Sequence, residues 1–201
     1  MPRVSQDHLD SRRQQILDAA RRCFARNGFH ATSMQDVLAE AKLSAGAVYR
    51  YFKGKDDIIV AIATTAVANV AGAFESVTHE DPPPSLPEVF ERVFTAIEDM
   101  DPDGDLAKTV VQVWGEALRS PVLFDEVTSR IGSVFEVMEE TVKLYQDRGI
   151  IDPDVPAARA ARVLISTLPG FLLQRALFGD VNAKLFAEGL RALLPRDGST
   201  G

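Results

Sequence analysis

Residues 32–55 have the sequence TSMQDVLAEAKLSAGAVYRYFKGK, and this stretch decides the fold that we expect for the chain. Ser33 and Asp36 have the spacing of a capping box at the start of a short helix. Ser44 is placed to cap a second short helix, expected over residues 45–52. Two short helices joined by a tight turn form a helix-turn-helix, whose second helix can enter the major groove of DNA.

The residue types around this turn suit a helix that approaches DNA closely. Ala41, Leu43 and Val48 are small or apolar where the two helices should pack on each other. The second helix starts with small side chains over residues 44–47, so its free N–H groups can come near phosphate. Donors for phosphates and base edges follow within residues 49–55.

Outside this stretch, apolar residues recur at three- and four-residue spacing, which predicts an all-α protein. Turn residues divide the pattern into nine helices, and a proline-rich loop over 79–87 separates the fourth from the fifth. A kink is expected at Pro169, inside the eighth. The expected helices cover about residues 11–27, 33–41, 45–52, 56–78, 85–100, 105–119, 121–148, 157–178 and 182–194.

The composition indicates a globular protein with one sizeable core or two. Hydrophobic residues make up 46% of the 201 residues and charged residues 25%. No apolar run has the length of a membrane span, and the polar N-terminus does not resemble a secretory signal. The chain has one cysteine, Cys23, which excludes an internal disulfide. We therefore expect a cytoplasmic protein without a membrane partner.

The charge is distributed unevenly along the chain. The net charge is −7, but residues 1–56 contain ten Lys and Arg against six Asp and Glu and carry +4, which leaves −11 for residues 57–201. A basic head can approach phosphates while an acidic body is repelled. Ordinary surface charge would give the same numbers, so this asymmetry alone does not decide between the two interpretations.

A set of positions over about residues 11–60 resembles the DNA-binding domain of the tetracycline-repressor (TetR/AcrR) family. The positions are Ile16-Leu17-x-Ala19-Ala20, Phe24-x-x-x-Gly28-Phe29, Thr32-Ser33, Ala41-x-Leu43-Ser44-x-Gly46 and Tyr49-x-Tyr51-Phe52-x-x-Lys55. The resemblance implies a DNA-binding domain of three helices over residues 1–56. It implies a helical domain for ligand binding and dimerisation over residues 57–201.

The resemblance also implies roles for individual residues of the helix-turn-helix. Phosphate contacts are expected from Ser33, Tyr49 and Lys55, and Ser44 is expected to cap the second helix and lie near phosphate. Contacts at or near base edges are expected from Gln35, Ala45, Gly46 and Arg50.

The chemistry of these side chains refines the expected contacts. Gln35 could bond adenine through two hydrogen bonds, and Arg50 could bond guanine in the same way. A solvated or phosphate-bound Arg50 is the alternative. For Tyr51 we favour packing against the first or fourth helix.

For residues 57–201 the resemblance implies a ligand cavity among the fourth to seventh helices. It also implies a dimer formed by the eighth and ninth helices, over 157–178 and 182–194. The eighth helix is apolar on more than one side, which fits a second buried face, although a central core helix would look the same. The candidate cavity residues, for each of which core packing is the alternative, are Phe90, Phe94, Trp114, Phe135, Met138 and Phe171.

Two features could shape the chemistry of that cavity. Trp114 is the strongest candidate, because its indole N–H needs a hydrogen-bond partner. Glu116 and Glu139 lie near the apolar stripes and would favour a cationic ligand, unless they are solvated surface residues.

Together these observations predict a ligand-responsive transcriptional repressor. It would bind a palindromic operator as a homodimer and be released by a small apolar or amphipathic effector. An enzyme is disfavoured, because the three histidines lie far apart and no nucleophile elbow, P-loop or dinucleotide motif is present. We expect no catalytic residues, metal or cofactor. A helical binding protein without DNA activity and an activator remain as alternatives.

Overall fold

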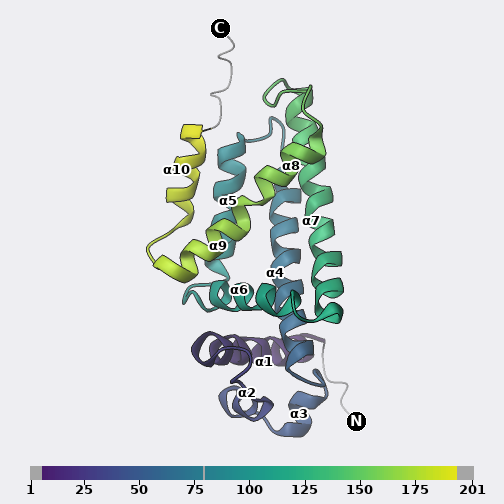
Figure 1. Cartoon of the computed structure of the whole chain (residues 1–201), viewed down its shortest axis with the longest axis vertical. Helices are drawn as coiled ribbons and strands as arrows, with labels where there is room; N and C mark the ends of the chain where they lie inside the picture. Colours follow the sequence, from purple (N-terminus) through teal and green to yellow (C-terminus); the bar gives the residue numbers. More distant parts are fainter. Residues whose placement is uncertain (1–5, 79, 194–201) are drawn as a thin grey trace.

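The computed structural model describes residues 6–78 and 80–193 of the chain. These residues form ten helices, joined by turns and loops, and no strand. They span Gln6–Asn27 (α1), Met34–Ala41 (α2), Ala45–Tyr49 (α3), Lys55–Thr78 (α4), Leu86–Asp99 (α5), Asp105–Ala117 (α6), Pro121–Asp147 (α7), Ala157–Ile165 (α8), Thr167–Phe178 (α9) and Ala183–Leu193 (α10). The all-α fold is confirmed. Figure 1 shows α1–α3 at one end and α6 across the middle, with α4, α5 and α7 running toward the other end.

The helix-turn-helix is capped as the sequence predicts. The backbone N–H of Asp36 donates to the Ser33 hydroxyl at 3.2 Å, and the Asp36 carboxylate accepts from the Ser33 N–H at 2.8 Å. These bonds from Ser33 lower the pKa of Asp36. Lys42 takes a left-handed conformation, with φ of 54°, and turns the chain sharply after α2. The Ser44 hydroxyl then accepts from Ala47 N–H at 3.4 Å and caps α3.

Two helix limits differ from the expected ones. α1 begins at Gln6, five residues before the expected start, because polar residues there continue the helix without adding to the apolar stripe. α3 ends at Tyr49 instead of residue 52. The Val48 carbonyl accepts from the N–H groups of both Tyr51 and Phe52, at 2.9 and 3.1 Å, and this turn closes the helix. At the C-terminus, the expected end of the last helix at Leu194 lies outside the described residues.

One buried cluster, here called the head core, joins α1–α3 to the helices above them. Apolar residues of α1 pack on α2, α3 and the start of α4, and residues of α6 and the start of α7 close the cluster from the other side. Its buried members are Ile16, Leu17, Ala20, Phe24, Phe29, Val37, Val48, Phe52, Ile58, Ile59, Ala61, Ile62, Leu106, Val110, Val113, Ala117, Leu123 and Val127. The core therefore continues across the expected boundary at residue 56.

The central helix α4 is more apolar than expected. Residues Lys55–Ser76 are long and apolar enough, with mean hydropathy 1.7, to span a membrane by length and composition alone, so the expectation that no segment has this character was wrong. In this fold α4 packs against α1, α5 and α7. Its buried residues are Ile58, Ile59, Ala61, Ile62 and Phe74, and much of the rest of the helix is only partly covered.

A second cluster, the body core, fills the space between α5, α7, α8, α9 and α10. Its centre is aromatic: Phe90, Phe94 and Phe171 are fully buried, and the ring centroids of Phe94 and Phe171 are 4.5 Å apart. Phe186 of α10 contacts both of these rings, at 5.3 and 5.1 Å. This cluster holds α9 and α10 on the body.

The helix expected over 157–178 is divided into α8 and α9 at Ser166. Pro169 has no N–H to donate to the carbonyl of Ile165, four residues earlier, so the helix is interrupted there. The expected disturbance at Pro169 thus takes the form of a one-residue interruption at Ser166, beside the cavity described below.

Candidate DNA-binding surface and ligand cavity

Most of the predicted DNA-contacting residues lie on one exposed surface formed by α2 and α3. Gln35 and Arg50 are exposed, and the described part of the chain offers neither side chain a hydrogen-bond partner. Ser44, Ala45 and Gly46 form the exposed start of α3. Val48 is fully buried beneath them and anchors this short helix to the head core.

Tyr49 projects from this surface. Its side chain is 49% exposed, although it is a large aromatic residue, and its hydroxyl has no partner among the described residues. Tyr51, two residues later, is partly buried against the head core, which fits the packing role favoured from the sequence. Tyr49 is therefore the tyrosine that is available to an external phosphate.

The basic residues of the head are not equally available to DNA. Arg22 and Arg26 both bond Glu40, at 2.8 and 3.3 Å, which ties α1 to α2. Lys42, Arg50 and Lys53 flank α3, are exposed and make no ion pair within the described residues. Three exposed cations that make no ion pair in the described part of the chain thus lie around α3.

Ser33 and Lys55 are engaged within the protein. The Ser33 hydroxyl donates to the Asp36 carboxylate at 2.7 Å, so its proton is not free for phosphate. The Lys55 ammonium donates to the carbonyl oxygens of Phe29, His30 and Thr32, at 2.8, 3.3 and 3.2 Å. Since an ammonium has three N–H donors, the expected phosphate contact of Lys55 is at odds with this geometry.

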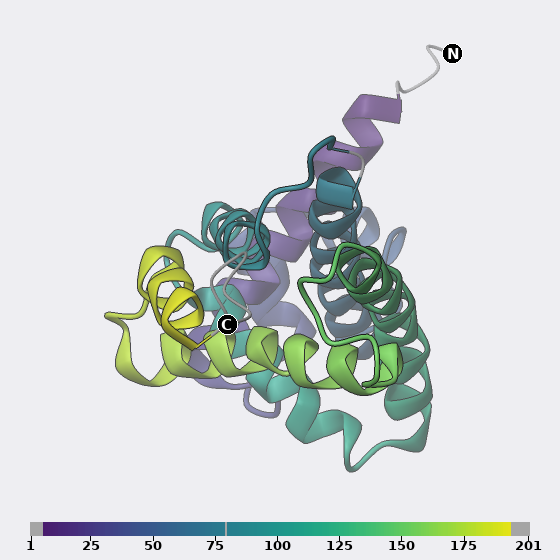
Figure 2. The ribbon, with the colours of Figure 1, turned by 90° about the horizontal axis from the view of Figure 1, so that it is seen from above.

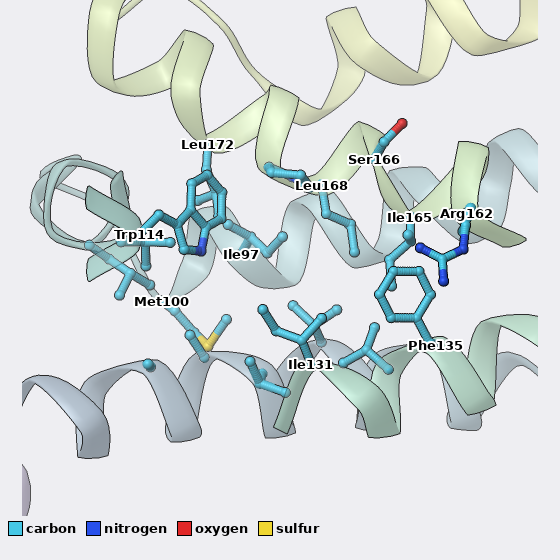
Figure 3. Close-up of a pocket in the computed structure, with 18 residues that line it drawn as sticks. Ile97, Met100, Trp114, Ile131, Phe135, Arg162, Ile165, Ser166, Leu168 and Leu172 are labelled. Atoms are coloured by element: carbon cyan, nitrogen blue, oxygen red, sulfur yellow. The ribbon is translucent and has the colours of Figure 1, made fainter. Parts of the chain in front are cut away.

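A cavity of about 480 Å³ lies in the body between α4, α6, α7, α8 and α9 (Figure 3). Nearly all of its wall is aliphatic or aromatic, as in many small-molecule sites. It is lined by Ala63, Ala66, Val67, Val70, Ile97, Met100, Leu106, Val110, Trp114, Ile131, Val134, Phe135, Arg162, Ile165, Ser166, Leu168, Pro169 and Leu172.

Three lining residues carry polar groups. Figure 3 shows Trp114 at one end of the cavity and Arg162 beside Phe135 at the other. The Arg162 guanidinium lies 5.4 Å from the centre of the Phe135 ring. The Ser166 hydroxyl donates to the Val163 carbonyl at 2.6 Å, within its own helix.

Two of the six candidate cavity residues, Trp114 and Phe135, line this cavity. The other four are buried in the body core and do not line it: Phe90, Phe94, Met138 and Phe171. They come from α5, α7 and α9 and are buried together in this cluster, so the alternative of core packing describes their position.

Sequence reasoning missed Arg162 as a cavity residue. A signal was present, since Arg162 precedes Ile165 by three residues and Pro169 by seven, and these spacings share a helix face. The two acids considered for a cationic ligand lie elsewhere. Glu116 accepts from His30 Nε2 at 2.8 Å, and Glu139 pairs with Lys143 at 2.8 Å.

Helix α6 connects the cavity to the DNA-binding helices. Gln112 donates through Nε2 to the Phe24 carbonyl of α1, at 3.0 Å, and accepts through Oε1 from the Phe29 N–H, at 2.8 Å. The contact between Glu116 and His30 lies one turn further along α6. Because Trp114 lines the cavity from the same helix, a displacement of α6 would act on both sites.

No group of three or more His, Cys, Asp or Glu side chains is close enough to hold a metal ion in the described segments 6–78 and 80–193. Cys23 is fully buried on α1, and burial raises the pKa of its thiol. It therefore has the environment of a core residue.

Comparison with known proteins finds a likeness in the DNA-binding segment. Residues 16–62 match the family model described as bacterial regulatory proteins of the tetR family. The regulator UidR of Escherichia coli is 26% identical over 182 residues, which is 90% of each protein.

Solved structures extend the likeness to the whole TetR-family fold. GusR of Salmonella enterica superimposes with a TM-score of 0.76 at 26% identity, over 96% of both chains. SmeT, solved in complex with triclosan, superimposes with a TM-score of 0.71 at 24% identity, over 94% of this chain and 93% of that one. Over most of its length the chain is thus similar to HTH-type transcriptional regulators, and this likeness supports the expectation that it is not an enzyme.

Proposed function

We propose that this protein is a transcriptional repressor that binds a palindromic operator as a homodimer and releases it when a small apolar or amphipathic effector fills the cavity. The observation that carries the proposal is the double role of α6. It lines the cavity with Leu106, Val110 and Trp114 and holds the end of α1 through Gln112. A ligand that prefers a different position of α6 would weaken DNA binding by its difference in affinity for the two states.

An apolar face on α8, α9 and α10 supports the homodimer. These helices follow one another along one flank of the molecule (Figure 2). Leu177 and Phe178 are 66% and 68% exposed, at the end of α9. The other large apolar residues exposed on these helices are Val163, Leu173, Leu185 and Leu193. Large apolar residues exposed on three successive helices suit a subunit interface.

A two-fold dimer explains a palindromic operator. Two symmetric copies of α3 would meet successive major grooves about 34–36 Å apart on one side of the DNA. We assign phosphate contacts to Tyr49 and to the cations around α3, and base contacts to Gln35 and Arg50. Ala45 and Gly46 would allow close approach of the backbone, with Ser44 holding the start of the helix.

We assign DNA binding to residues 1–56, and ligand binding and dimerisation to residues 57–201. This boundary is a functional one, because α4 runs through it and the head core extends across it. Trp114 and Phe135 are retained as candidate ligand contacts. We place the protein in the cytoplasm, where a bacterial operator is accessible.

Selection from random DNA duplexes with the purified full-length protein tests this proposal. Enriched sequences should contain an inverted repeat, and analytical ultracentrifugation of the complex should give two chains per duplex. Enrichment of a single unrepeated site, or a complex with one chain, would contradict the homodimer. Binding to none of the duplexes would contradict the proposed DNA contacts as well.

A further inference from the structure

Arg162 places a positive charge in the wall of an otherwise apolar cavity. It extends from α8 toward Phe135, and its guanidinium packs over that ring (Figure 3). Its neighbours along the wall are Ile165 and Leu168, and the hydroxyl of Ser166 is bonded to the Val163 carbonyl. Arg162 is therefore the cavity residue that is able to bind a charged ligand.

The guanidinium of Arg162 has no carboxylate partner among the residues that the structure describes. Arg175, on the neighbouring α9, shows the contrast: it bonds Glu98 at 2.7 Å and the carbonyls of Asp101 and Val181, at 3.1 and 3.2 Å. Glu139, one turn after Phe135 on α7, is paired with Lys143. The charge of Arg162 is thus left for solvent or for a ligand.

Arg162 is an exposed residue, so its guanidinium is hydrated at the edge of the cavity, and a ligand seated against it would replace part of that water. A guanidinium deprived of water is costly unless an anion pairs with it. Its planar fork matches a carboxylate through two parallel hydrogen bonds, and packing on Phe135 leaves the edge of the fork available. A ligand with one negative charge would balance the single positive charge of Arg162.

We propose that the effector is an amphipathic carboxylic acid whose carboxylate pairs with Arg162 and whose apolar body extends toward Trp114. The inference rests on the proposed function, because it assigns a ligand class to the same effector cavity. The carboxylate supplies selectivity at the Arg162 end, and the aliphatic wall supplies affinity for the body of the ligand.

Decanoate and 1-decanol are matched probes for this inference, since they differ at the head group. Trp114 is the single tryptophan of the chain and lines the cavity, so its fluorescence reports binding directly. We expect decanoate to bind the full-length protein about tenfold more tightly than 1-decanol, because its carboxylate gains hydrogen bonds to a charged donor that the alcohol forms less strongly.

Substitutions at two arginines of α8 distinguish a specific contact with the head group of the ligand from a general effect of losing positive charge. Arg162→Gln should reduce decanoate affinity to that of 1-decanol and leave 1-decanol binding unchanged, while Arg162→Lys should retain part of the preference. Arg159→Gln removes the same charge one turn earlier, outside the cavity wall, and should leave both affinities unchanged. Thermal unfolding followed by circular dichroism checks that each variant is folded.

The possible results distinguish this inference from the proposed function. Equal affinities for the two probes, unaffected by Arg162→Gln, would overturn the carboxylate assignment and leave an apolar effector cavity. Absence of any fluorescence change with both probes would also overturn it. Failure of the ligand-free protein to bind DNA would overturn the proposed function, whereas decanoate binding sensitive to Arg162 would still support the carboxylate assignment.

Discussion

The ammonium nitrogen of Lys55 lies 2.8 Å from the carbonyl oxygen of Phe29 and 4.5 Å from the centre of its ring. The carbonyls of His30 and Thr32 complete the set of acceptors. These groups belong to the loop that follows α1, while Lys55 is the first residue of α4. The lysine therefore fastens the start of α4 to the loop between the first two helices.

Lys55→Met should lower the free energy of unfolding by about 1–3 kcal/mol, because loop carbonyls lose hydrogen bonds to a charged donor. Lys53→Met, an exposed neighbour, should change it by less than about 0.5 kcal/mol. Urea unfolding measures both. The salt dependence of operator binding by folded Lys55→Met should match the wild type; a slope reduced by about one would instead demonstrate a phosphate contact.

Tyr49→Phe should weaken operator binding by roughly tenfold without changing stability, since the hydroxyl is free to donate to phosphate and removal costs one charge-assisted hydrogen bond. Fluorescence anisotropy with a labelled operator measures the affinity, and urea unfolding supplies the stability. An unchanged affinity would remove Tyr49 from the DNA surface.

Arg50→Ala should cost about 1–3 kcal/mol of binding and relax the preference for guanine at one operator position, if the guanidinium contacts that base. Competition with operators substituted at each position identifies it. A uniform loss on all sequences would assign Arg50 to phosphate instead. Arg159→Ala, on the distant helix α8, serves as the control for loss of positive charge.

Asp101→Ala should lower the free energy of unfolding by about 1–3 kcal/mol, since a buried hydrogen-bond donor without a partner carries a cost of that size. The Asp101 carboxylate accepts from the N–H groups of Leu106 and Ala107, at 2.7 and 3.0 Å, and caps the start of α6. Burial raises the pKa of this carboxyl, although these bonds oppose the shift. Asp103→Ala, at an exposed position in the same turn, should leave the urea midpoint almost unchanged.

Leu177→Glu should convert the proposed dimer into a monomer, because it would bury one charge from each subunit within the proposed interface. Sedimentation velocity measures the change, and operator affinity should fall with it. Leu118→Glu tests the same substitution on a residue that is 80% exposed, between α6 and α7, and should remain dimeric. A dimeric Leu177→Glu variant would place the interface elsewhere.

Gln112→Met should separate effector binding from operator release. The variant keeps the length of the side chain but loses the hydrogen bonds to Phe24 of α1 and to Phe29 in the loop after it, so decanoate should bind normally and reduce operator affinity less than in the wild type. Lys108→Met, one turn earlier on α6 and exposed, is the control. Equal coupling in both variants would exclude Gln112 as a link.

Local features of the helix-turn-helix could be predicted because they depend on residues close in sequence. The capping box of Ser33 and Asp36 and the cap at Ser44 follow from spacing alone, and so does the interruption caused by Pro169. The role of Lys55 could not be predicted in this way. Its acceptors lie 23 to 26 residues earlier, and only the packing of α1 against α4 brings them together.

The cavity was only partly predictable for a related reason. Helical periodicity indicates that Phe94, Phe135 and Phe171 face the interior, but the interior has both a packed aromatic cluster and an open cavity. Which of these a side chain meets depends on the rotation of each helix against its neighbours. Arg162 was missed because a charge on a helix is normally assigned to solvent.

The head core also limits how this protein could be recombined with its relatives. Chimeric repressors are built by joining the DNA-binding segment of one protein to the sensor of another. Here such an exchange at residue 56 would divide a cluster shared with Val110, Val113 and Leu123. A functional hybrid would also need the residues of α6 and α7 that pack against its DNA-binding helices. The DNA-binding segment and the ligand-binding part of this protein therefore cannot be exchanged independently.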